Sequence, residues 1–367
     1  MCGIVGYVGT RPAEPVLLDG LRRLEYRGYD SAGVAVLDGG SLQVRKKAGR
    51  IASLAEELER LPTRGGTGIG HTRWATHGGP SDRNSHPHVS ADGRVALVHN
   101  GVIENYAALK RRLQDEGVEF ASDTDTEVIA HLVARHLDGD LLAAVAQVLP
   151  LLKGTYGLAV VSPLFPGLVV GARLGSPLAI GIGDGEHFLA SDPLALAGRA
   201  RQAVYLADRQ VCSITARDYR LREAGKGSVQ GTVLKIEHGE EDTGRGAFAH
   251  HMLKEIHEQP EALENALRGR LCEADSTAHF GGLNLDPKQL REAERIILTA
   301  CGTSWHAALV GEYLIEEFAR LPVEVEYASE FRYRNPPIDK GTIVIALTQS
   351  GETADTLAAL RESKRKG

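Results

Sequence analysis

A cysteine at the second position of the chain has the chemistry of a nucleophilic catalyst. Cys2 directly follows the initiator methionine, and it is small enough for that methionine to be trimmed. Cys2 would then carry both a thiol and a free α-amino group. The amine has a reference pKa of about 7.7–8.0 and the thiol one of about 8.5, so the amine can take a proton from the thiol as the thiol attacks a carbonyl. The alternative is an ordinary thiol near a frayed chain end.

Three further stretches carry side chains that suit a small polar ligand. Arg73, on a glycine-rich loop, can hold a carboxylate through two parallel hydrogen bonds. Asp125 either accepts an ammonium group or caps the helix that begins beside it. Asn100-Gly101 either faces a developing oxyanion or forms an Asn-Gly turn. Together with Cys2, these groups fit a free amino acid that bears a side-chain amide, and glutamine is the obvious candidate.

Hydroxyl-bearing segments follow two predicted strands near the end of the sequence. Residues 301–304 (Cys-Gly-Thr-Ser) follow a strand at 296–299, and residues 348–353 (Thr-Gln-Ser-Gly-Glu-Thr) follow a strand at 343–347. Hydroxyl and free N–H groups at helix N-termini, at the carboxyl ends of parallel strands, form an anion pocket. Ser350 could instead cap the helix after it, but two such segments in one small sheet favour a phosphate.

The elements that must position these residues differ between two parts of the chain. In residues 2–224, helical segments accompany many short strands, which indicates an α+β layered domain with two stacked sheets. The polar, glycine-rich segment 225–249 indicates a linker, and 250–286 a helical connection. In 287–367, the strand–helix–strand order predicts parallel βαβ units, too few to complete a sheet.

Length, charge and cysteine content limit the class of protein. The 367 residues allow two domains, and the net charge of −6 argues against nucleic acid or an anionic membrane as a partner. No apolar run approaches the roughly 18 residues that a membrane span needs, and the first residues lack the basic-then-apolar pattern of a secretion signal. The four cysteines form no C-x-x-C pair, which argues against a disulfide framework and a zinc site. We therefore expect a cytoplasmic protein.

Two other patterns could suggest a metal site and a nucleotide-binding loop, but the spacing of their residues favours neither. Five histidines crowd one region, at positions 71, 77, 86, 88 and 99, but they lack the arrangement typical of zinc ligands, so no metal is expected. The glycine-rich segment 181–185 lacks the helix that a nucleotide-binding loop requires, so a hairpin turn is the better interpretation.

Five sequence blocks resemble, in order, those of the glutamine–fructose-6-phosphate aminotransferase family. The blocks are Cys2–Gly6 (CGIVG), Leu21–Gly33 (LRRLEYRGYDSAG), His71–Gly78 (HTRWATHG), His99-Asn100-Gly101 and Thr124–Glu127 (TDTE). The long second block is more specific than the short opening, which all such amidotransferases share. The resemblance runs from Cys2 to Thr353. It implies a four-layer α/β/β/α sandwich, the N-terminal nucleophile amidotransferase fold, followed by a partial α/β parallel-sheet sugar isomerase domain.

The resemblance also implies a role for each matching residue. Cys2 would be the nucleophile, with Asn100 and Gly101 as the oxyanion hole. Arg73 would bind the α-carboxylate of glutamine and Asp125 its α-amino group. The remaining glutamine-site residues would be Thr76 and His77 in a lid at 73–79, Trp74 as the gate of an ammonia channel, and Arg27. The predicted fructose-6-phosphate contacts are Thr303, Ser304, Thr348, Gln349, Ser350 and Thr353. Position 348 departs from the family, which usually has Ser there: threonine keeps the hydroxyl group and adds a methyl group.

The activity implied by the resemblance is the conversion of D-fructose-6-phosphate to D-glucosamine-6-phosphate with ammonia from L-glutamine. This is the first step of amino-sugar synthesis, requires no cofactor, and is performed by a homodimer. The family's second sugar isomerase lobe would lie beyond Gly367, so we expect glutaminase activity without sugar amination from this chain alone. The alternatives are another type-2 glutamine amidotransferase, such as the phosphoribosyl-pyrophosphate type, and a non-catalytic sugar-phosphate sensor.

Overall fold

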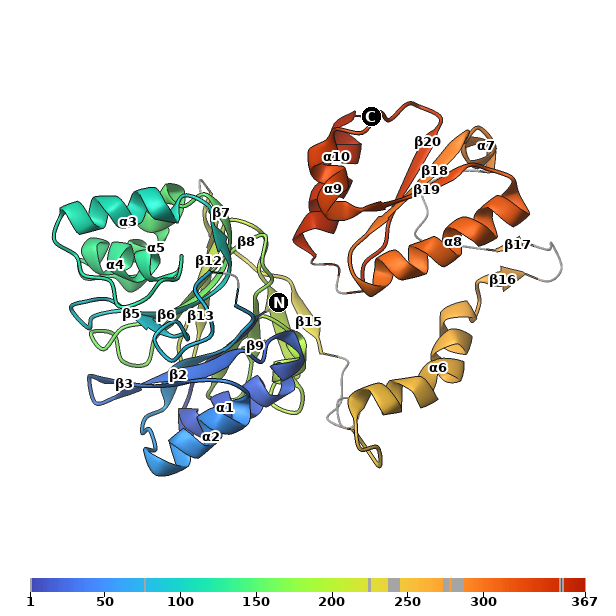
Figure 1. Cartoon of the computed structure of the whole chain (residues 1–367). Helices are drawn as coiled ribbons and strands as arrows, with labels where there is room; N and C mark the ends of the chain where they lie inside the picture. The colour runs from blue at the N-terminus through green and yellow to red at the C-terminus, as the bar shows by residue number, and fades with distance from the viewer. Residues whose placement is uncertain are drawn as a thin grey trace. The chain divides into compact units, whose positions relative to one another are not determined.

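The computed structural model of the chain forms two compact units, Met1–Gly244 and Arg245–Gly367 (Figure 1). The residues that the structure describes are 2–75, 77–223, 226–236, 245–272, 277–278, 287–349, 351 and 353–366. None of the helices in this described part combines the length and apolar character needed to cross a bilayer.

The first unit contains an eight-stranded antiparallel sheet in the order β15-β11-β9-β10-β1-β4-β2-β3. Its strands are β1 (Gly3–Val8), β2 (Ser31–Asp38), β3 (Ser41–Ala48), β4 (Thr67–Arg73), β9 (Ala179–Ile182), β10 (His187–Ala190), β11 (Gln202–Tyr205) and β15 (Val233–Lys235). Strands β1 and β4 lie side by side near the centre, with Gly3 opposite Thr72. This pairing brings the start of the chain next to the end of β4.

The same unit contains a second sheet of seven strands in the order β14-β13-β12-β8-β7-β6-β5. These strands are β5 (His88–Val89), β6 (Ala96–Ile103), β7 (Gly154–Val161), β8 (Val169–Leu174), β12 (Gln210–Ile214), β13 (Tyr219–Glu223) and β14 (Gly227–Val229). Strands β6 and β7 are antiparallel neighbours over their full length. Asn100 and Gly101 lie in the second half of β6.

Alternating side chains bury both faces of each sheet, because successive residues of a strand point to opposite sides. Ile4 of β1 and Val98 of β6 belong to a core between the two sheets. Tyr7 of β1 belongs to the core that faces α1 (Ala13–Arg23) and α2 (Ile51–Arg60). Leu97 of β6 belongs to a third core, beneath α3 (Tyr106–Asp115), α4 (Glu127–His136) and α5 (Leu141–Val148).

The resulting order of layers is helices, sheet, sheet, helices (Figure 1). The four-layer α/β/β/α sandwich predicted from the resemblance is confirmed. The first unit also contains three short 3-10 turns: η1 (Glu25–Arg27), η2 (Leu149–Leu151) and η3 (Pro193–Leu196).

Part of the segment predicted to be a linker is incorporated into the two sheets. Strand β14 pairs with β13, and β15 pairs with β11. Each of these strands has three residues, too few for a periodic pattern to be recognised in the sequence. Their strand conformation follows from the partners that the sheets provide. Residues 237–244 lie outside the described part of the chain.

The second unit contains a parallel sheet in the order β19-β18-β20. Its core residues fall on two faces, one beneath α8 and one beneath α9 and α10, so the predicted partial parallel-sheet domain is confirmed. The elements of this unit are α6 (His251–Leu267), β16 (Leu271–Cys272), β17 (Thr277–Ala278), α7 (Pro287–Arg291), β18 (Arg295–Ala300), α8 (Thr303–Ala319), β19 (Val323–Tyr327), α9 (Ala328–Arg334), β20 (Thr342–Ala346) and α10 (Ala354–Lys366).

Candidate active site

The candidate site lies where the layer between the two sheets changes from apolar to polar side chains. Ile4, Ile69 and Val98 belong to the inter-sheet core. Two residues further along their strands toward the site, the same face carries Cys2, His71 and Asn100, because side-chain direction repeats every second residue. The alternation that builds the core therefore also directs these polar groups into one place.

Cys2 is held in place by the backbone that follows β4. The Trp74 N–H donates to Cys2 Sγ at 3.2 Å, and the thiol lies 3.6 Å from the Trp74 carbonyl oxygen. Burial raises the pKa of the Cys2 thiol, while the Trp74 N–H and the positive charge of Arg73 act in the opposite direction. A buried thiol with a raised pKa needs a nearby base before it can attack as a thiolate.

Asn100 reaches across from the second sheet to the first residue of the site. Its Nδ2 donates to the Cys2 carbonyl oxygen at 2.9 Å. The next residue, Gly101, has φ of +131°, and a Cβ there would lie 2.2 Å from the Thr155 carbonyl oxygen. Only glycine fits this position, which favours a specialised backbone geometry over an ordinary Asn-Gly turn.

Arg73 is buried at the end of β4 and has one nitrogen left for a ligand. Its Nη2 donates to the carbonyl oxygens of His77 and of Gly78, the latter at 3.0 Å. Its Nη1 is buried without a hydrogen-bond partner among the described residues. Burial lowers the pKa of Arg73, and the charges of Cys2 and Asp125 oppose this. An unpaired guanidinium nitrogen beside Cys2 suits an incoming carboxylate.

Asp125 does not cap the helix that follows it. The N-cap residue of α4 is Thr126, and no side chain caps this end of the helix. The Asp125 carboxylate instead accepts the Ile103 N–H at 2.8 Å, and the residue is buried. Of the two interpretations of Asp125 from the sequence, the structure does not show the helix cap, and the binding of an ammonium group stays a prediction.

The lid predicted at 73–79 is fastened to the segment that precedes β2. Asp30 accepts the Ala75 N–H at 2.8 Å, and the Trp74 ring lies edge-on to Tyr29 at 5.5 Å. A Cβ on Gly28 would lie 2.8 Å from the Trp74 nitrogen, so glycine allows the two backbones to touch. Trp74 itself is half exposed.

The remaining predicted glutamine-site residues have different surroundings. The His77 ring lies edge-on to Tyr106 at 5.5 Å. Arg27 is buried and forms an ion pair with Asp192, to which Tyr26 also donates at 2.7 Å. Thr76 lies outside the described residues. The structure thus brings Cys2, Asn100, Arg73, Asp125 and Trp74 together. Arg27, in contrast, is paired with the carboxylate of Asp192.

Four of the five clustered histidines form a buried group behind the site. The rings of His71 and His86 stack at 4.2 Å, and His88 lies edge-on to His86 at 4.6 Å. The fourth, His99, contacts Thr126 Oγ1 through Nδ1 and the Thr155 carbonyl oxygen through Nε2. Burial lowers the pKa of all four, that of His71 to about 3. These rings are neutral hydrogen-bonding groups, a role that sequence analysis missed.

The segments predicted to bind a sugar phosphate meet at one edge of the second unit's sheet. Thr303 and Ser304 open α8 after β18, and Thr348 and Gln349 follow β20, the neighbour of β18. Thr348 Oγ1 accepts the Gly351 N–H at 3.1 Å, so the hydroxyl organises its own loop. Thr353 directly precedes α10, and Ser350 lies outside the described residues.

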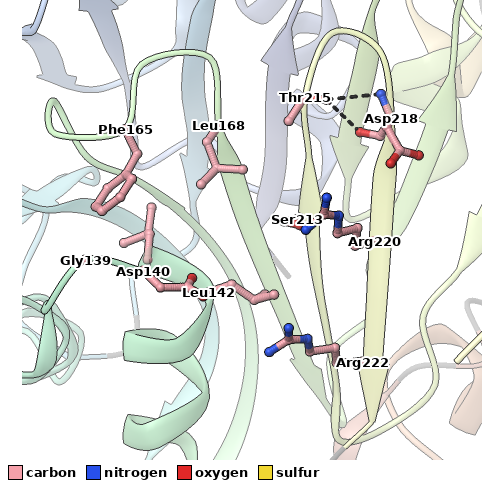
Figure 2. Close-up of a pocket in the computed structure, with 11 residues that line it drawn as sticks. Gly139, Asp140, Leu142, Phe165, Leu168, Ser213, Thr215, Asp218, Arg220 and Arg222 are labelled. Atoms are coloured by element: carbon pink, nitrogen blue, oxygen red, sulfur yellow. Dashed lines mark hydrogen bonds between the residues drawn. The ribbon is translucent and has the colours of Figure 1, made fainter. Parts of the chain in front are cut away.

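A separate cavity of about 410 Å³ lies elsewhere in the first unit, between the start of α5 and the β12–β13 hairpin (Figure 2). Arg220 and Arg222 of β13 line it together with Leu142 and Phe165. None of the residues predicted to act in catalysis or ligand binding lines this cavity, so it is distinct from the candidate site.

A layered sandwich whose first strand begins beside a cysteine, an asparagine and an arginine has the features of a glutamine amidotransferase. Comparison with known proteins agrees, and the chain belongs to the glutamine amidotransferase domain family, whose model matches residues 44–241. A model of the SIS domain matches residues 289–367. Most strands of the first unit's two antiparallel sheets lie in the part matched by the first model, and the parallel sheet lies in the part matched by the second.

The most informative relatives carry the name glutamine–fructose-6-phosphate aminotransferase [isomerizing]. The chain is 52% identical to the protein of that name from Chlorobaculum tepidum and 50% identical to one from Thermus thermophilus, in both cases over all of this chain. It spans 61% and 60% of their lengths. The resemblance predicted from the five sequence blocks is therefore confirmed.

Solved structures support the fold of the chain. The glutamine phosphoribosylpyrophosphate amidotransferase from B. subtilis is 22% identical, with a TM-score of 0.53, and the match covers 88% of this chain and 65% of that one. At this identity the likeness concerns architecture alone. It agrees with the four-layer sandwich described above.

Proposed function

We propose that Cys2 hydrolyses the side-chain amide of L-glutamine, and that the ammonia released serves to convert D-fructose-6-phosphate into D-glucosamine-6-phosphate. The observation that carries this proposal is the convergence of Cys2, the Asn100 amide and Arg73 Nη1 at one end of the inter-sheet layer, where Nη1 has no hydrogen-bond partner among the residues that the structure describes. The sugar half of the proposal is supported by the names of the relatives.

In the proposed reaction, the α-amine of Cys2 takes the thiol proton while Sγ bonds to the amide carbon of glutamine. The Asn100 Nδ2 and the Gly101 N–H receive the negative charge that develops on the amide oxygen. The carbon–nitrogen bond then breaks, the proton passes from the amine to the leaving nitrogen, and ammonia departs from a thioester. Water then adds to the thioester carbon while the amine takes a proton from the water. The carbon–sulfur bond breaks, glutamate leaves, and the amine returns the proton to the sulfur, which restores the thiol.

Glutamine is held at its other end by two charges of opposite sign. Arg73 would bind the α-carboxylate through Nη1, and Asp125 would accept the α-ammonium group. His77, Trp74 and Thr76 of the lid would cover the ligand, with Arg27 as a further glutamine-site residue whose ion pair with Asp192 would have to rearrange. The carboxylate and ammonium contacts distinguish free glutamine from a glutamine residue within a protein.

The second unit would bind the phosphate of the sugar. Thr303, Ser304, Thr348, Gln349, Ser350 and Thr353 are the proposed contacts, on the loops that follow two adjacent parallel strands. The proposal places the reaction in the cytoplasm, where the thiol stays reduced. It requires no cofactor, and it expects a homodimer for the full-length protein.

The test is glutamate release from glutamine, with and without fructose-6-phosphate, by protein whose first residue has been identified by mass spectrometry. We expect glutamate release that depends on removal of Met1 and is abolished in Cys2→Ala. Cys212 is fully buried, and burial raises the pKa of its thiol to about 12, so Cys212→Ala is the matched control. Full activity from protein that retains Met1 would refute the proposed mechanism, and glucosamine-6-phosphate is measured in parallel.

A further inference from the structure

His71 contacts the side-chain oxygen of the asparagine whose amide nitrogen reaches Cys2. It is buried on β4, directly opposite Ile4 of β1. Its Nε2 lies 3.0 Å from Asn100 Oδ1 and 3.1 Å from the His99 carbonyl oxygen. One ring nitrogen thus contacts both the backbone of β6 and the side chain that reaches Cys2.

The chemistry of these partners fixes where the proton of His71 resides. A backbone carbonyl oxygen can only accept a hydrogen bond, so Nε2 must carry the proton and donate to His99. The same N–H can approach only an acceptor on Asn100, which is Oδ1. The amide nitrogen of Asn100 is then directed to the other side, where it meets the carbonyl oxygen of Cys2 at 2.9 Å.

An Asn100 amide rotated by 180° would lose both its hydrogen bond with His71 and its hydrogen bond with Cys2. Its NH₂ group would face the N–H of His71, and its oxygen would face the carbonyl oxygen of Cys2. A buried polar group left without a suitable partner is costly, so two mismatches leave the observed orientation strongly favoured. The donor side of the amide is thereby presented to the nucleophile before any substrate arrives.

Neighbouring rings prevent His71 from rotating or changing its charge. His71 stacks on His86 at 4.2 Å with the planes 19° apart, and His86 Nδ1 in turn accepts the His99 N–H at 3.2 Å. Burial lowers the pKa of His71 to about 3, and its Nδ1 is buried with no partner in the described part of the chain. A second proton on Nδ1 would have no acceptor, which keeps Nε2–H as the one donor.

We propose that His71 is a positioning residue for glutamine hydrolysis: its Nε2–H holds the Asn100 amide with Nδ2 toward the oxygen that becomes negatively charged. This inference rests on the proposed function and adds a residue that does not touch the substrate. Without the His71 N–H, the Asn100 amide can rotate by 180°. The oxyanion then loses a hydrogen-bond donor that was already oriented toward it. The loss falls on the chemical step and not on glutamine binding, which depends on Arg73 and Asp125.

The experiment is a double-mutant cycle in glutamine hydrolysis, with His71→Phe as the variant that retains a ring but lacks the donor. We expect kcat to fall about 10- to 100-fold with KM for glutamine changed less than about threefold, because removal of one oxyanion donor costs about 10²–10³ in kcat. In the Asn100→Ala background, His71→Phe should cost less than about threefold. Equal losses in both backgrounds, or a loss confined to KM, would overturn the inference.

A second variant separates positioning from folding. His71→Gln removes the ring but keeps an amide N–H near the place of Nε2, and it should recover most of the activity that His71→Phe loses. A His71→Gln protein that folds, as judged by its thermal unfolding, yet is as slow as Asn100→Ala would contradict the inference. Alkylation of Cys2 by iodoacetamide, which forms no oxyanion, should proceed at a similar rate in all folded variants.

The outcome for the inference is distinguishable from the outcome for the proposed function. If the wild-type protein releases no glutamate, the proposed function itself is refuted. If the wild-type protein hydrolyses glutamine but the effects of the His71 and Asn100 substitutions are additive, only the proposed role of His71 is refuted.

Discussion

At the scale of single residues, the candidate site is defined by groups whose hydrogen bonds are incomplete. The Arg73 guanidinium uses Nη2 to hold the backbone of the lid, while Nη1 is buried without a partner among the described residues. Proteins rarely leave a buried cation partly unpaired, because desolvation without a compensating hydrogen bond is costly. The binding of a ligand's negative charge by this donor stays a prediction, which the next experiment tests.

Replacement of Arg73 by lysine tests this assignment. Lysine keeps the charge but cannot hold the lid with one nitrogen and a carboxylate with another. We expect Arg73→Lys to raise KM for glutamine about 10- to 100-fold, which corresponds to a lost charged hydrogen bond of about 1.5–3 kcal/mol. Steady-state kinetics of glutamate release measure the effect. Arg83→Lys, at an exposed arginine paired with Asp123, is the matched control, and equal KM values for the two variants would count against the assignment.

At the scale of elements, the loop that carries Asp125 is organised by a buried carboxylate at the start of the next helix. Glu127 accepts the N–H groups of Ala121 and Ser122 at 2.7 and 2.6 Å. Burial alone would raise the pKa of Glu127, but hydrogen bonds from His131, Ser122 and Ala121 outweigh it and hold the pKa at about 2. The helix α4 thus begins with a residue that ties the preceding loop to it.

Glu127→Gln should loosen this loop without touching the ligand. An amide can replace only part of the acceptor capacity of the carboxylate, so we expect the free energy of unfolding to fall by about 1–3 kcal/mol and KM for glutamine to rise. Because the folded-state pKa lies below the ordinary value of 4.5, the contribution is complete above pH 4.5 and is lost as the pH falls toward 2. Urea titrations at several pH values measure it. Glu119→Gln, at an exposed carboxylate of the same loop, should change neither quantity.

The structure also explains which parts of the site were predictable from sequence. Cys2 directly precedes β1, Arg73 ends β4 and Asn100 lies within β6, all recognisable strands for which local pattern and residue chemistry suffice. His71 contacts partners on another strand, and the histidine cluster raised only the question of a metal. Its role depends on how β4 and β6 are placed across two sheets, which no local pattern encodes. Glu127 binds the loop directly before it and His131 of its own helix, local contacts that sequence analysis missed. The strands β14 and β15 were missed for the reason that applies to His71, because their pairing depends on strands that are distant in sequence or too short to recognise.

At the scale of the whole molecule, the interior of the first unit contains four buried histidines that are neutral. Burial lowers the pKa of His71, His86, His88 and His99 in the folded state. After unfolding, these side chains return to an ordinary pKa of about 6.5. Below that pH the unfolded chain therefore binds more protons than the folded one. Stability must then rise with pH up to about 6.5 and fall as the solution is acidified.

This linkage predicts a steep acid instability of the first unit well above the range in which carboxylates protonate. Each excess proton contributes roughly 1.4 kcal/mol per pH unit, so the three histidines with the most strongly lowered pKa, His71, His86 and His88, give a slope of about 4 kcal/mol per pH unit near pH 5. Hydrogen exchange of the β4 and β6 amides in urea, between pH 7.5 and 5, reports the unfolding of this unit separately from the other. In His86→Asn, an amide oxygen can replace the acceptor Nδ1, and the slope should decrease by about one proton. His251→Asn, on the exposed helix α6, controls for the loss of a histidine elsewhere, and a flat stability profile across this pH range would show that the rings are already charged in the fold.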